Sequence, residues 1–286
     1  MILIKYGGAM SLDQYVEHIL YFFPSLKDRN YICKSGADND VILIDDYVFR
    51  FPKKKGDRRI ILEKEYLDII GNHITTNIPK ISIHNYVDNV FSSHNLINGI
   101  VLKDYNGDYD KIAKQIVVFL CELHSVKITN LKVIKLQDWY RDRIKENFDV
   151  IKDYLIATKV KCTFESDIEE YFNNVFDYES VVVHNDLHNE NIIVDSESGQ
   201  LNGVIDFTDI VFSDYHSDFV FLYKDLPTKI FDKITNEYAS LSKRPIDKEY
   251  IALAAKIFIY KEIGQKNEEQ KNAYHLNENL IRILET

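Results

Sequence analysis

The sequence predicts an α+β fold with two lobes, a small strand-rich N-terminal lobe over residues 1–102 and a larger, mainly helical C-terminal lobe over residues 103–286. Two observations lead to this prediction. Short β-rich runs fill much of the first hundred residues, whereas apolar residues recur at helical spacing through most of the chain after Asp108. The chain has 286 residues, of which 45% are hydrophobic, so it can bury a sizeable core.

The N-terminal lobe is predicted to combine strands with one helix. The β-rich runs are 41–44, 47–51, 81–84 and 99–102. Asp45-Asp46 separates the first two runs, which predicts a tight hairpin. A charged helical stretch follows at about residues 57–70 and ends at Gly71, where a helix C-cap is expected.

The C-terminal lobe is predicted to be helical with one strand-rich interruption. A short connector at residues 103–107 leads into it. Helices are expected over residues 112–123, 136–155, 229–241, 247–264 and 268–284. The interruption runs from about residue 181 to 207, and its β-rich runs 191–194 and 201–205 flank a turn-rich segment, which predicts a second hairpin.

Composition narrows the class of partner. The net charge of −10 argues mildly against a nucleic-acid binder and is compatible with a cationic partner. Cys33, Cys121 and Cys162 are too far apart for a zinc site or a disulfide framework and fit a reducing cytoplasm. The apolar runs at the N-terminus and at residues 116–121 are too short for a signal peptide or a membrane span. We therefore expect a cytoplasmic monomer that binds a small cationic molecule, and neither nucleic acid nor a membrane.

The strongest chemical signal lies in residues 181–194. His184, Asp186 and Asn191 have the H-x-D-x-x-x-x-N spacing of a kinase catalytic loop. In such a loop a carboxylate accepts the proton of the attacking hydroxyl, and a metal ligand lies close by. Asp186 is the predicted base and Asn191 a predicted Mg²⁺ ligand. Asp206, in the Ile-Asp-Phe that follows the second hairpin, can complete the metal site.

Each of these residues has a structural interpretation when it is taken alone. Asp186 could cap a turn and Asn191 could open a strand. The spacing of the two, together with the following Ile-Asp-Phe, favours the catalytic interpretation. For His184 and His188, holding the loop through hydrogen bonds is favoured over catalysis.

These motifs resemble those of the aminoglycoside phosphotransferase family, which has a protein-kinase-like fold. The resemblance covers roughly residues 30–225. Beyond the catalytic loop, residues 120–124 resemble the family's L-x-x-L-H helix end. Residues 205–209, Asp214 and residues 217–219 resemble its acidic run that includes the Ile-Asp-Phe. Residues 35–40 and 47–53 resemble a loop and a strand typical of the 2″-acting subgroup.

The resemblance implies a role for further residues. Residues 35–40, including Ser35, Gly36 and Asn39, would form a loop over the phosphates. Residues 100–103, including Ile100 and Leu102, would form the hinge that meets the nucleotide base. Asp218 resembles a buried aspartate that braces the backbone of the catalytic loop. The donor would be ATP or GTP, which the sequence does not distinguish because the hinge reads the base through backbone groups.

The chain departs from the family pattern at the strand lysine that pairs with the phosphates. Arg50 stands there, on the same strand face as Val48. Arginine keeps the charge and can bind phosphate bidentately, but its reach differs. Lys53 has the opposite parity and is a weaker candidate. The helix partner of Arg50 is predicted to be Glu65, with Glu63 as the alternative.

The acceptor is less well defined by the sequence. Because the family's antibiotic substrates are polycations, carboxylates are the candidates that would bind their ammonium groups. The predicted substrate-binding residues are Asp186, Glu190, Asp225 and Glu262, with Glu237, Glu268 and Glu269 as further candidates. Solvated surface is the alternative interpretation of each downstream acid. Lys224 would repel a polycation.

The predicted function is transfer of the γ-phosphoryl group of ATP or GTP to a hydroxyl of an aminoglycoside antibiotic, which would make the chain a resistance enzyme. Two alternatives remain. Lys224 motivates a kinase for another small alcohol, such as choline, homoserine or a macrolide. Arg50 motivates a nucleotide-binding pseudokinase that acts as a regulatory module.

Overall fold

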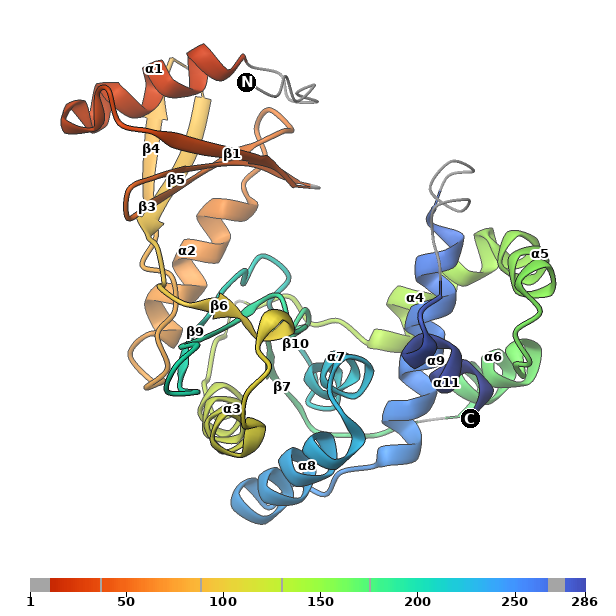
Figure 1. Ribbon diagram of the computed structural model, residues 1–286. Helices are drawn as coiled ribbons and strands as arrows, with labels where there is room; N and C mark the ends of the chain where they lie inside the picture. Colours follow the sequence, from red (N-terminus) through yellow and green to blue (C-terminus); the bar gives the residue numbers. More distant parts are fainter. Residues whose placement is uncertain (1–10, 37, 88, 130, 175, 267–275) are drawn as a thin grey trace. The chain divides into compact units, whose positions relative to one another are not determined.

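The computed structural model describes residues 11–286 with the exception of 37, 88, 130, 175 and 267–275 (Figure 1). The chain forms two compact units. The first holds the described residues up to Gly99 together with Asn202–Thr208, and the second holds Ile100–Leu201 and Asp209–Thr286. An antiparallel sheet dominates the first unit and helices dominate the second, so the predicted α+β class is confirmed. Among the described residues no helix is long and apolar enough to cross a membrane.

The first unit is built on a five-stranded antiparallel sheet. In spatial order its strands are β1 (Tyr31–Ser35), β2 (Asn39–Ile44), β3 (Tyr47–Pro52), β5 (Asn89–Asn95) and β4 (Ser82–Tyr86). The predicted hairpin at Asp45-Asp46 is confirmed, because Ile44 pairs with Tyr47 and Asp45 has a φ of 49°. Aspartate is one of the few residues that tolerate this left-handed conformation.

An N-terminal helix that the sequence analysis did not predict, α1 (Leu12–Phe22), covers one face of this sheet (Figure 1). Ser11 and Gln14 form a capping box at its start. Tyr15 packs on Phe51 with ring centroids 4.4 Å apart. Because side chains alternate along a strand, Phe49 and Phe51 of β3 join this core while Arg50 points away from it.

The remaining helix of the first unit is α2 (Arg59–Ile70), which matches the predicted helix. Gly71 is its C-cap, as expected, but in a right-handed conformation with φ −60°. Strands β1 and β5 were not predicted, because β1 has no buried residue and the buried positions of β5 are mostly polar. In β5 these positions include Ser92, Ser93 and His94.

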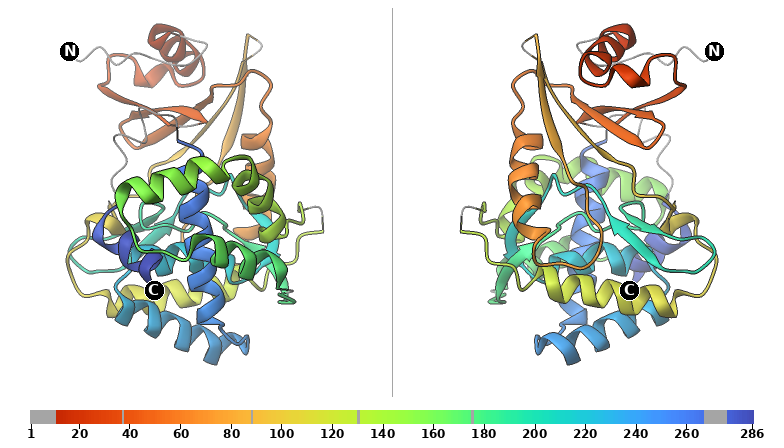
Figure 2. Two further views of the ribbon diagram at one scale, coloured as in Figure 1. Left: turned by 90° about the vertical axis from the view of Figure 1, so that its right-hand side faces the viewer. Right: turned by 90° about the vertical axis from the view of Figure 1, so that its left-hand side faces the viewer.

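The second unit is a helical assembly around one central helix. Its helices are α3 (Tyr109–Leu123), α4 (Leu136–Glu146), α5 (Phe148–Thr158), α6 (Phe164–Asn173), α7 (Ser217–Asp225), α8 (Thr228–Ser242), α9 (Lys248–Gly264) and α11 (Glu278–Glu285). Helix α9 is buried along most of its length and packs against α4, α5, α6, α7 and α11 (Figure 2). The hydrophobic core of this unit therefore lies around α9.

Two helix predictions need correction or completion, and one further helix was not predicted. The helix predicted over 136–155 is two helices, because the backbone leaves the helical conformation at Asn147, with φ −119° and ψ 14°. Helix α6 was not predicted. Helix α11 corresponds to the end of the helix predicted over 268–284, and residues 268–275 lie outside the described part of the chain.

Short strands hold the two ends of the predicted catalytic loop. Strand β7 (Ser180–Val183) precedes the loop and pairs with β10 (Val211–Asp214). Strand β8 (Ile192–Val194) follows the loop and pairs with β6 (Ile100–Val101). From β9 (Leu201–Val204) onward the chain leaves the second unit and contributes residues 202–208 to the first.

Candidate active site

The loop between β7 and β8 is held by a buried aspartate at the start of α7. Asp218 is fully buried and accepts hydrogen bonds from the backbone N–H groups of His184 at 3.0 Å and Asn185 at 2.7 Å. His124, at the end of α3, contacts the same carboxylate through Nε2 at 3.1 Å and the Tyr238 hydroxyl through Nδ1 at 2.7 Å. The prediction that Asp218 braces the loop backbone is confirmed.

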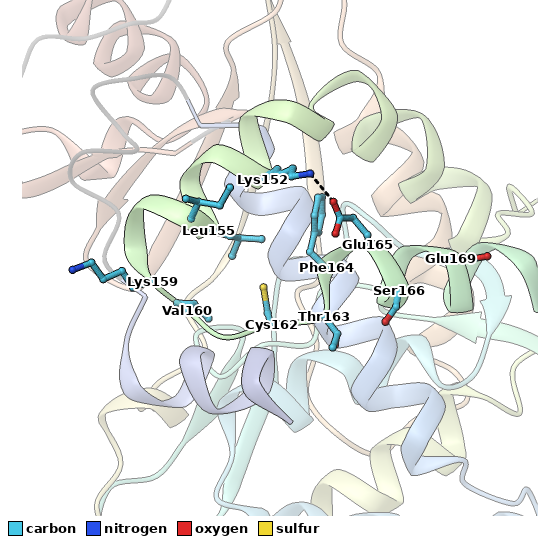
Figure 3. Close-up of a pocket in the computed structure, with 11 residues that line it drawn as sticks. Lys152, Leu155, Lys159, Val160, Cys162, Thr163, Phe164, Glu165, Ser166 and Glu169 are labelled. Carbon is cyan, nitrogen blue, oxygen red and sulfur yellow. Dashed lines mark hydrogen bonds and ion pairs between the residues drawn. The ribbon is translucent and has the colours of Figure 1, made fainter.

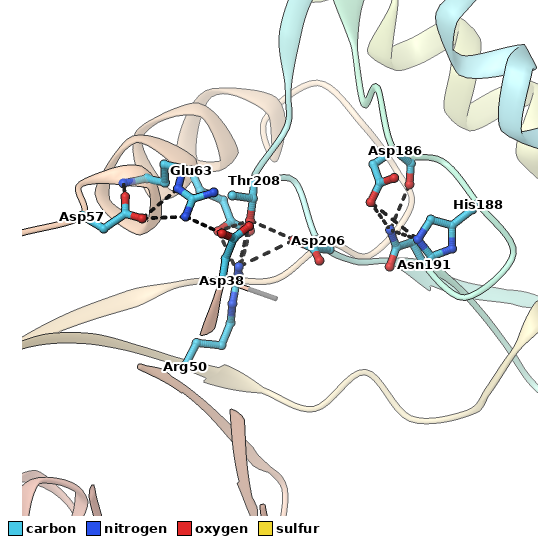
Figure 4. Close-up of polar contacts among 10 residues, drawn as sticks. Asp38, Arg50, Asp57, Glu63, Asp186, His188, Asn191, Asp206 and Thr208 are labelled. Carbon is cyan, nitrogen blue, oxygen red and sulfur yellow. Dashed lines mark hydrogen bonds and ion pairs between the residues drawn. The ribbon is translucent and has the colours of Figure 1, made fainter. Parts of the chain in front are cut away.

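This bracing fixes the side chains of Asp186 and Asn191 against each other (Figure 4). Asn185, just before Asp186, has a φ of 63°. A non-glycine residue in this conformation is held there by its surroundings, here by Asp218. The Asn191 amide donates from Nδ2 to the Asp186 backbone oxygen at 2.9 Å and to Asp186 Oδ2 at 3.2 Å. Its amide oxygen is therefore the atom that suits a hard cation.

Both histidines of the loop bind its backbone, which confirms their predicted holding role. His184 Nδ1 accepts from the Asp186 N–H at 3.3 Å, and His188 Nδ1 accepts from the Glu190 N–H at 3.2 Å. The Nε2 atom of His188 lies 3.5 Å from Asp186 Oδ2. Burial lowers the pKa of the His188 imidazole. The negative charges of three acids raise it, Asp186 most strongly, followed by Asp225 and Glu190, and the net shift of the pKa is upward.

In the first unit Arg50 binds Glu63 (Figure 4). The predicted partner Glu65 is exposed. Arg50 Nη1 donates to both Glu63 carboxylate oxygens at 2.8 Å. The preference for Glu65 was wrong because Glu63 is buried at helical spacing with Ile60 and Leu67, whereas Glu65 lies on the solvent face of α2.

Arg50 also reaches the segment that carries the second predicted metal ligand. Its Nη2 lies 2.8 Å from Thr208 Oγ1 and 3.6 Å from Asp206 Oδ1. Thr208 donates to Asp206 at 2.8 Å. Burial lowers the pKa of Arg50, but Glu63 and then Asp206 shift it upward, and the net shift is upward. Thr208, where a protein kinase would have glycine, was given no role in the sequence analysis.

The Asp206 side chain is suited to an ion. It is half exposed, and its backbone has a φ of 63°, so Asp206, like Asn185, lies in the left-handed region. Asn191 belongs to the second unit and Asp206 to the first, so their pairing around one Mg²⁺ stays a prediction. Within the described residues no group of three or more His, Cys, Asp or Glu side chains could hold a metal ion.

The predicted phosphate loop connects β1 and β2. Ser35 donates from Oγ to Asp40 at 2.7 Å, and Gly36 donates from its backbone N–H to the Asn39 carbonyl at 2.9 Å. Tyr15 donates to the other oxygen of the buried Asp40 carboxylate at 2.7 Å. Lys53 donates to the Gly36 carbonyl. Asp40 therefore anchors the loop, a role that the sequence analysis did not assign.

The predicted hinge is tied to the catalytic loop inside the second unit. Ile100 of β6 pairs with Val194 of β8. Leu102 is buried and opens a short 3₁₀ helix, Leu102–Asp104. The next residue, Lys103, donates its backbone N–H to the Asn189 carbonyl at 3.1 Å.

A polar pocket of about 460 Å³ opens beside the catalytic loop, within the second unit. It is lined by Asp186 and by the other three predicted substrate-binding carboxylates, Glu190, Asp225 and Glu262. Asp225 also accepts the backbone N–H of Asn189 at 3.0 Å. The further candidate Glu237 does not line this pocket, and Glu268 and Glu269 lie outside the described residues.

Each of the pocket carboxylates Glu190, Asp225 and Glu262 lies against a lysine. The ammonium-to-carboxylate distances are 2.5 Å for Lys103 and Glu190, 2.9 Å for Lys224 and Asp225, and 3.0 Å for Lys261 and Glu262. Of these three lysines, only Lys224 was recognised from the sequence. Two of the pairs are neighbours in the sequence and could have been found there, whereas Lys103 meets Glu190 only through the β6–β8 pairing.

A second pocket, of about 610 Å³, lies between the end of α5 and the start of α6 (Figure 3). It contains an ion pair between Lys152 and Glu165 at 2.7 Å. The half-buried Cys162 also lines it, and burial raises the pKa of its thiol. A thiol with a raised pKa is a poor nucleophile. None of the residues assigned to phosphoryl transfer lines this pocket.

Comparison with known proteins shows the family to which the chain belongs. The family model described as the phosphotransferase enzyme family, APH, matches residues 32–246. No curated protein sequence matches the chain.

Solved structures of similar fold include phosphotransferases with different acceptors. The GDP and kanamycin complex of APH(2″)-IIIa superposes with a TM-score of 0.74 at 20% identity, and the match covers 95% of this chain and 96% of that one. The streptomycin–ATP complex of APH(2″)-IIa has a TM-score of 0.65 at 23% identity, with 97% of each chain covered. The macrolide 2′-phosphotransferase MphH from Brachybacterium faecium has a TM-score of 0.69 at 16% identity, with 96% and 98% covered. The predicted protein-kinase-like fold is confirmed.

Proposed function

Because the chain belongs to the phosphotransferase enzyme family, we propose that it transfers the γ-phosphoryl group of ATP or GTP to a hydroxyl of an aminoglycoside, with Asp186 as the base. The observation that carries this proposal is the catalytic loop itself. Asp218 holds its backbone, and Asn191 Nδ2 donates one hydrogen bond to the Asp186 backbone oxygen and one to the Asp186 carboxylate. A preorganised carboxylate of this kind is what positioning a hydroxyl nucleophile requires.

Phosphoryl transfer needs charge neutralisation and in-line geometry more than covalent help from the protein. Asp186 would accept the proton of the acceptor hydroxyl. Asn191 and Asp206 would hold Mg²⁺, which would supply the neutralisation of the phosphate oxygens. Arg50 is a permanent cation, and its position 3.6 Å from Asp206 supports a role at the phosphates.

We assign nucleotide binding to the N-terminal lobe, residues 1–102, and catalysis and acceptor binding to residues 103–286. Ser35, Gly36 and Asn39 would lie over the phosphates, and Ile100 and Leu102 would meet the base. For the charged partner of Arg50 this proposal uses Glu63, because it accepts both hydrogen bonds in the structure.

The acceptor assignment is supported by fold similarity to enzymes whose structures hold kanamycin or streptomycin. It is also supported by the carboxylates beside the catalytic loop, which suit ammonium groups. A kinase for a less charged alcohol is the second candidate, and the lysines beside those carboxylates favour it. We further propose that the enzyme acts as a cytoplasmic monomer.

The test is steady-state phosphoryl transfer by the purified protein with Mg²⁺, ATP or GTP and a panel of aminoglycosides. Stimulation of nucleotide turnover by an aminoglycoside supports the proposal. Asp186→Asn should lower turnover by about 10³-fold, within the usual range for general-base catalysis, with little change in nucleotide affinity. Asp195→Asn, in the turn after β8, is the control. Failure of every aminoglycoside beside turnover of another alcohol would favour the second candidate, and wild-type turnover in Asp186→Asn would refute the base assignment.

A further inference from the structure

The pocket beside the catalytic loop already contains ammonium groups, and they belong to the protein. Besides its carboxylate, Lys261 has the ring of Phe258, whose centroid lies 4.2 Å from Nζ. Lys224 lies 5.7 Å from the Phe221 centroid and 5.9 Å from that of Phe258. Carboxylates and aromatic faces are the two protein features that bind ammonium groups most strongly. In this pocket both kinds of feature are in contact with lysine.

The charges of the lining residues follow the same pattern. Five carboxylates and three lysines line the pocket, which gives a formal charge of −2 with His188 neutral. One of those negative charges belongs to Asp186, which must stay available to the hydroxyl. The remaining single negative charge would be neutralised by one ammonium group, whereas an aminoglycoside such as kanamycin carries several ammonium groups. An acceptor with many ammonium groups would have to displace lysines from their carboxylates.

We propose that Lys103, Lys224 and Lys261 determine acceptor specificity, and that they restrict the pocket to hydroxylated amino sugars that carry one ammonium group. This inference rests on the phosphotransferase activity of the proposed function, and for the acceptor it favours the second candidate, a less charged alcohol, over a polycationic aminoglycoside. Like charges confined at contact distance repel, and the repulsion grows as water leaves the site. The lysines thus exclude polycations by repulsion and by occupying the carboxylates, which is how charged sites commonly reject the wrong partner.

The experiment measures binding, so that it does not depend on turnover. Calorimetry gives the affinities of kanamycin and of a kanamycin derivative that keeps one free amine and is N-acetylated at the others. The proteins are the wild type, Lys103→Gln, Lys224→Gln and Lys152→Gln, each checked for an unchanged melting temperature. Lys152 pairs with Glu165 in the other pocket, so Lys152→Gln makes the same change in net charge away from the site. Lys224→Arg keeps the charge and should behave as the wild type.

The wild type should bind the monoamine derivative more tightly than kanamycin. Lys103→Gln and Lys224→Gln should each raise kanamycin affinity by about tenfold, from the loss of one like-charge contact, and change that of the derivative by less than about twofold. The proposal is overturned if kanamycin binds the wild type as tightly as the derivative does. It is also overturned if Lys152→Gln produces the same gain, or if kanamycin binds none of the four proteins. Failure of the proposed function is seen separately, as the absence of acceptor-stimulated turnover whatever the affinities.

Discussion

Replacing Glu63 by glutamine tests the assignment of the buried partner of Arg50. The substitution keeps the volume of the side chain but removes its charge and one of the two oxygens that accept from Arg50 Nη1 at 2.8 Å. Arg50 is only 8% exposed, so water cannot take over the lost interaction. Thr208 and, at 3.6 Å, Asp206 remain as its other contacts.

The magnitude follows from this geometry. Removing one partner of a buried ion pair costs about 3–5 kcal/mol, and the remaining amide oxygen of Gln places Glu63→Gln near 3 kcal/mol. With a denaturant slope of about 2–3 kcal/mol per M, this lowers the urea midpoint by about 1–1.5 M. Nucleotide affinity should fall as well, because Arg50 would lose its fixed orientation.

Urea unfolding followed by circular dichroism measures the loss, and hydrogen exchange on α2 localises it to the first unit. Glu65→Gln is the matched control, since Glu65 lies two residues away on the exposed face of the same helix. It should change stability by less than about 0.5 kcal/mol. Equal midpoints for the Glu63→Gln variant and the wild type, or an equal loss in Glu65→Gln, would refute the assignment.

Three further predictions concern the loop, the metal and the packing of β9. Asp218→Asn removes the negative charge of the carboxylate that accepts hydrogen bonds from two backbone N–H groups of the loop. Turnover should fall by about 10–100-fold, with smaller changes in nucleotide affinity. Asp214→Asn serves as the comparison. Asp206→Ala should weaken nucleotide binding in Mg²⁺ but not in EDTA, as titration would show, and equal losses in both would contradict a metal role. Gly203→Ala should destabilise the protein by about 1–3 kcal/mol in thermal unfolding, because its Cβ would lie 2.7 Å from the Asn77 carbonyl oxygen, and an unchanged melting temperature would count against this packing.

The sequence predicted the β2–β3 hairpin and helices α2, α3, α8 and α9 close to their observed bounds. Apolar periodicity is strong in α3 and α8 but weak in α2 and α9, and α2 was predicted from its charged stretch and Gly71. Strand β5 was missed because its paired positions carry serine and histidine, and the break at Asn147 was missed because nothing in the local composition interrupts the helical pattern. Helix α1 has an ordinary capping box, a signal that was present but not used.

The site was predictable wherever spacing along the chain places the residues together. Asp186 and Asn191 share one loop, and Asp218 was identified through its motif. To choose between Glu63 and Glu65, one must know which face of α2 is buried. The two glutamates are only two residues apart, and their positions in the sequence did not show which face that is. The lysine opposite Glu190 required the pairing of two strands that are distant in the sequence.

The first unit takes Asn202–Thr208 from far along the chain, and this has a consequence for biosynthesis. A ribosome must translate residue 208 before Arg50 can meet Thr208 and Asp206. The nascent N-terminal sheet can form the ion pair of Arg50 with Glu63, but it lacks the contacts of Arg50 with Thr208 and Asp206 while the first hundred residues of the other unit are translated. A fragment that stops near residue 102 would lack these contacts, so we expect the intact chain, and not its N-terminal portion, to be the unit of folding.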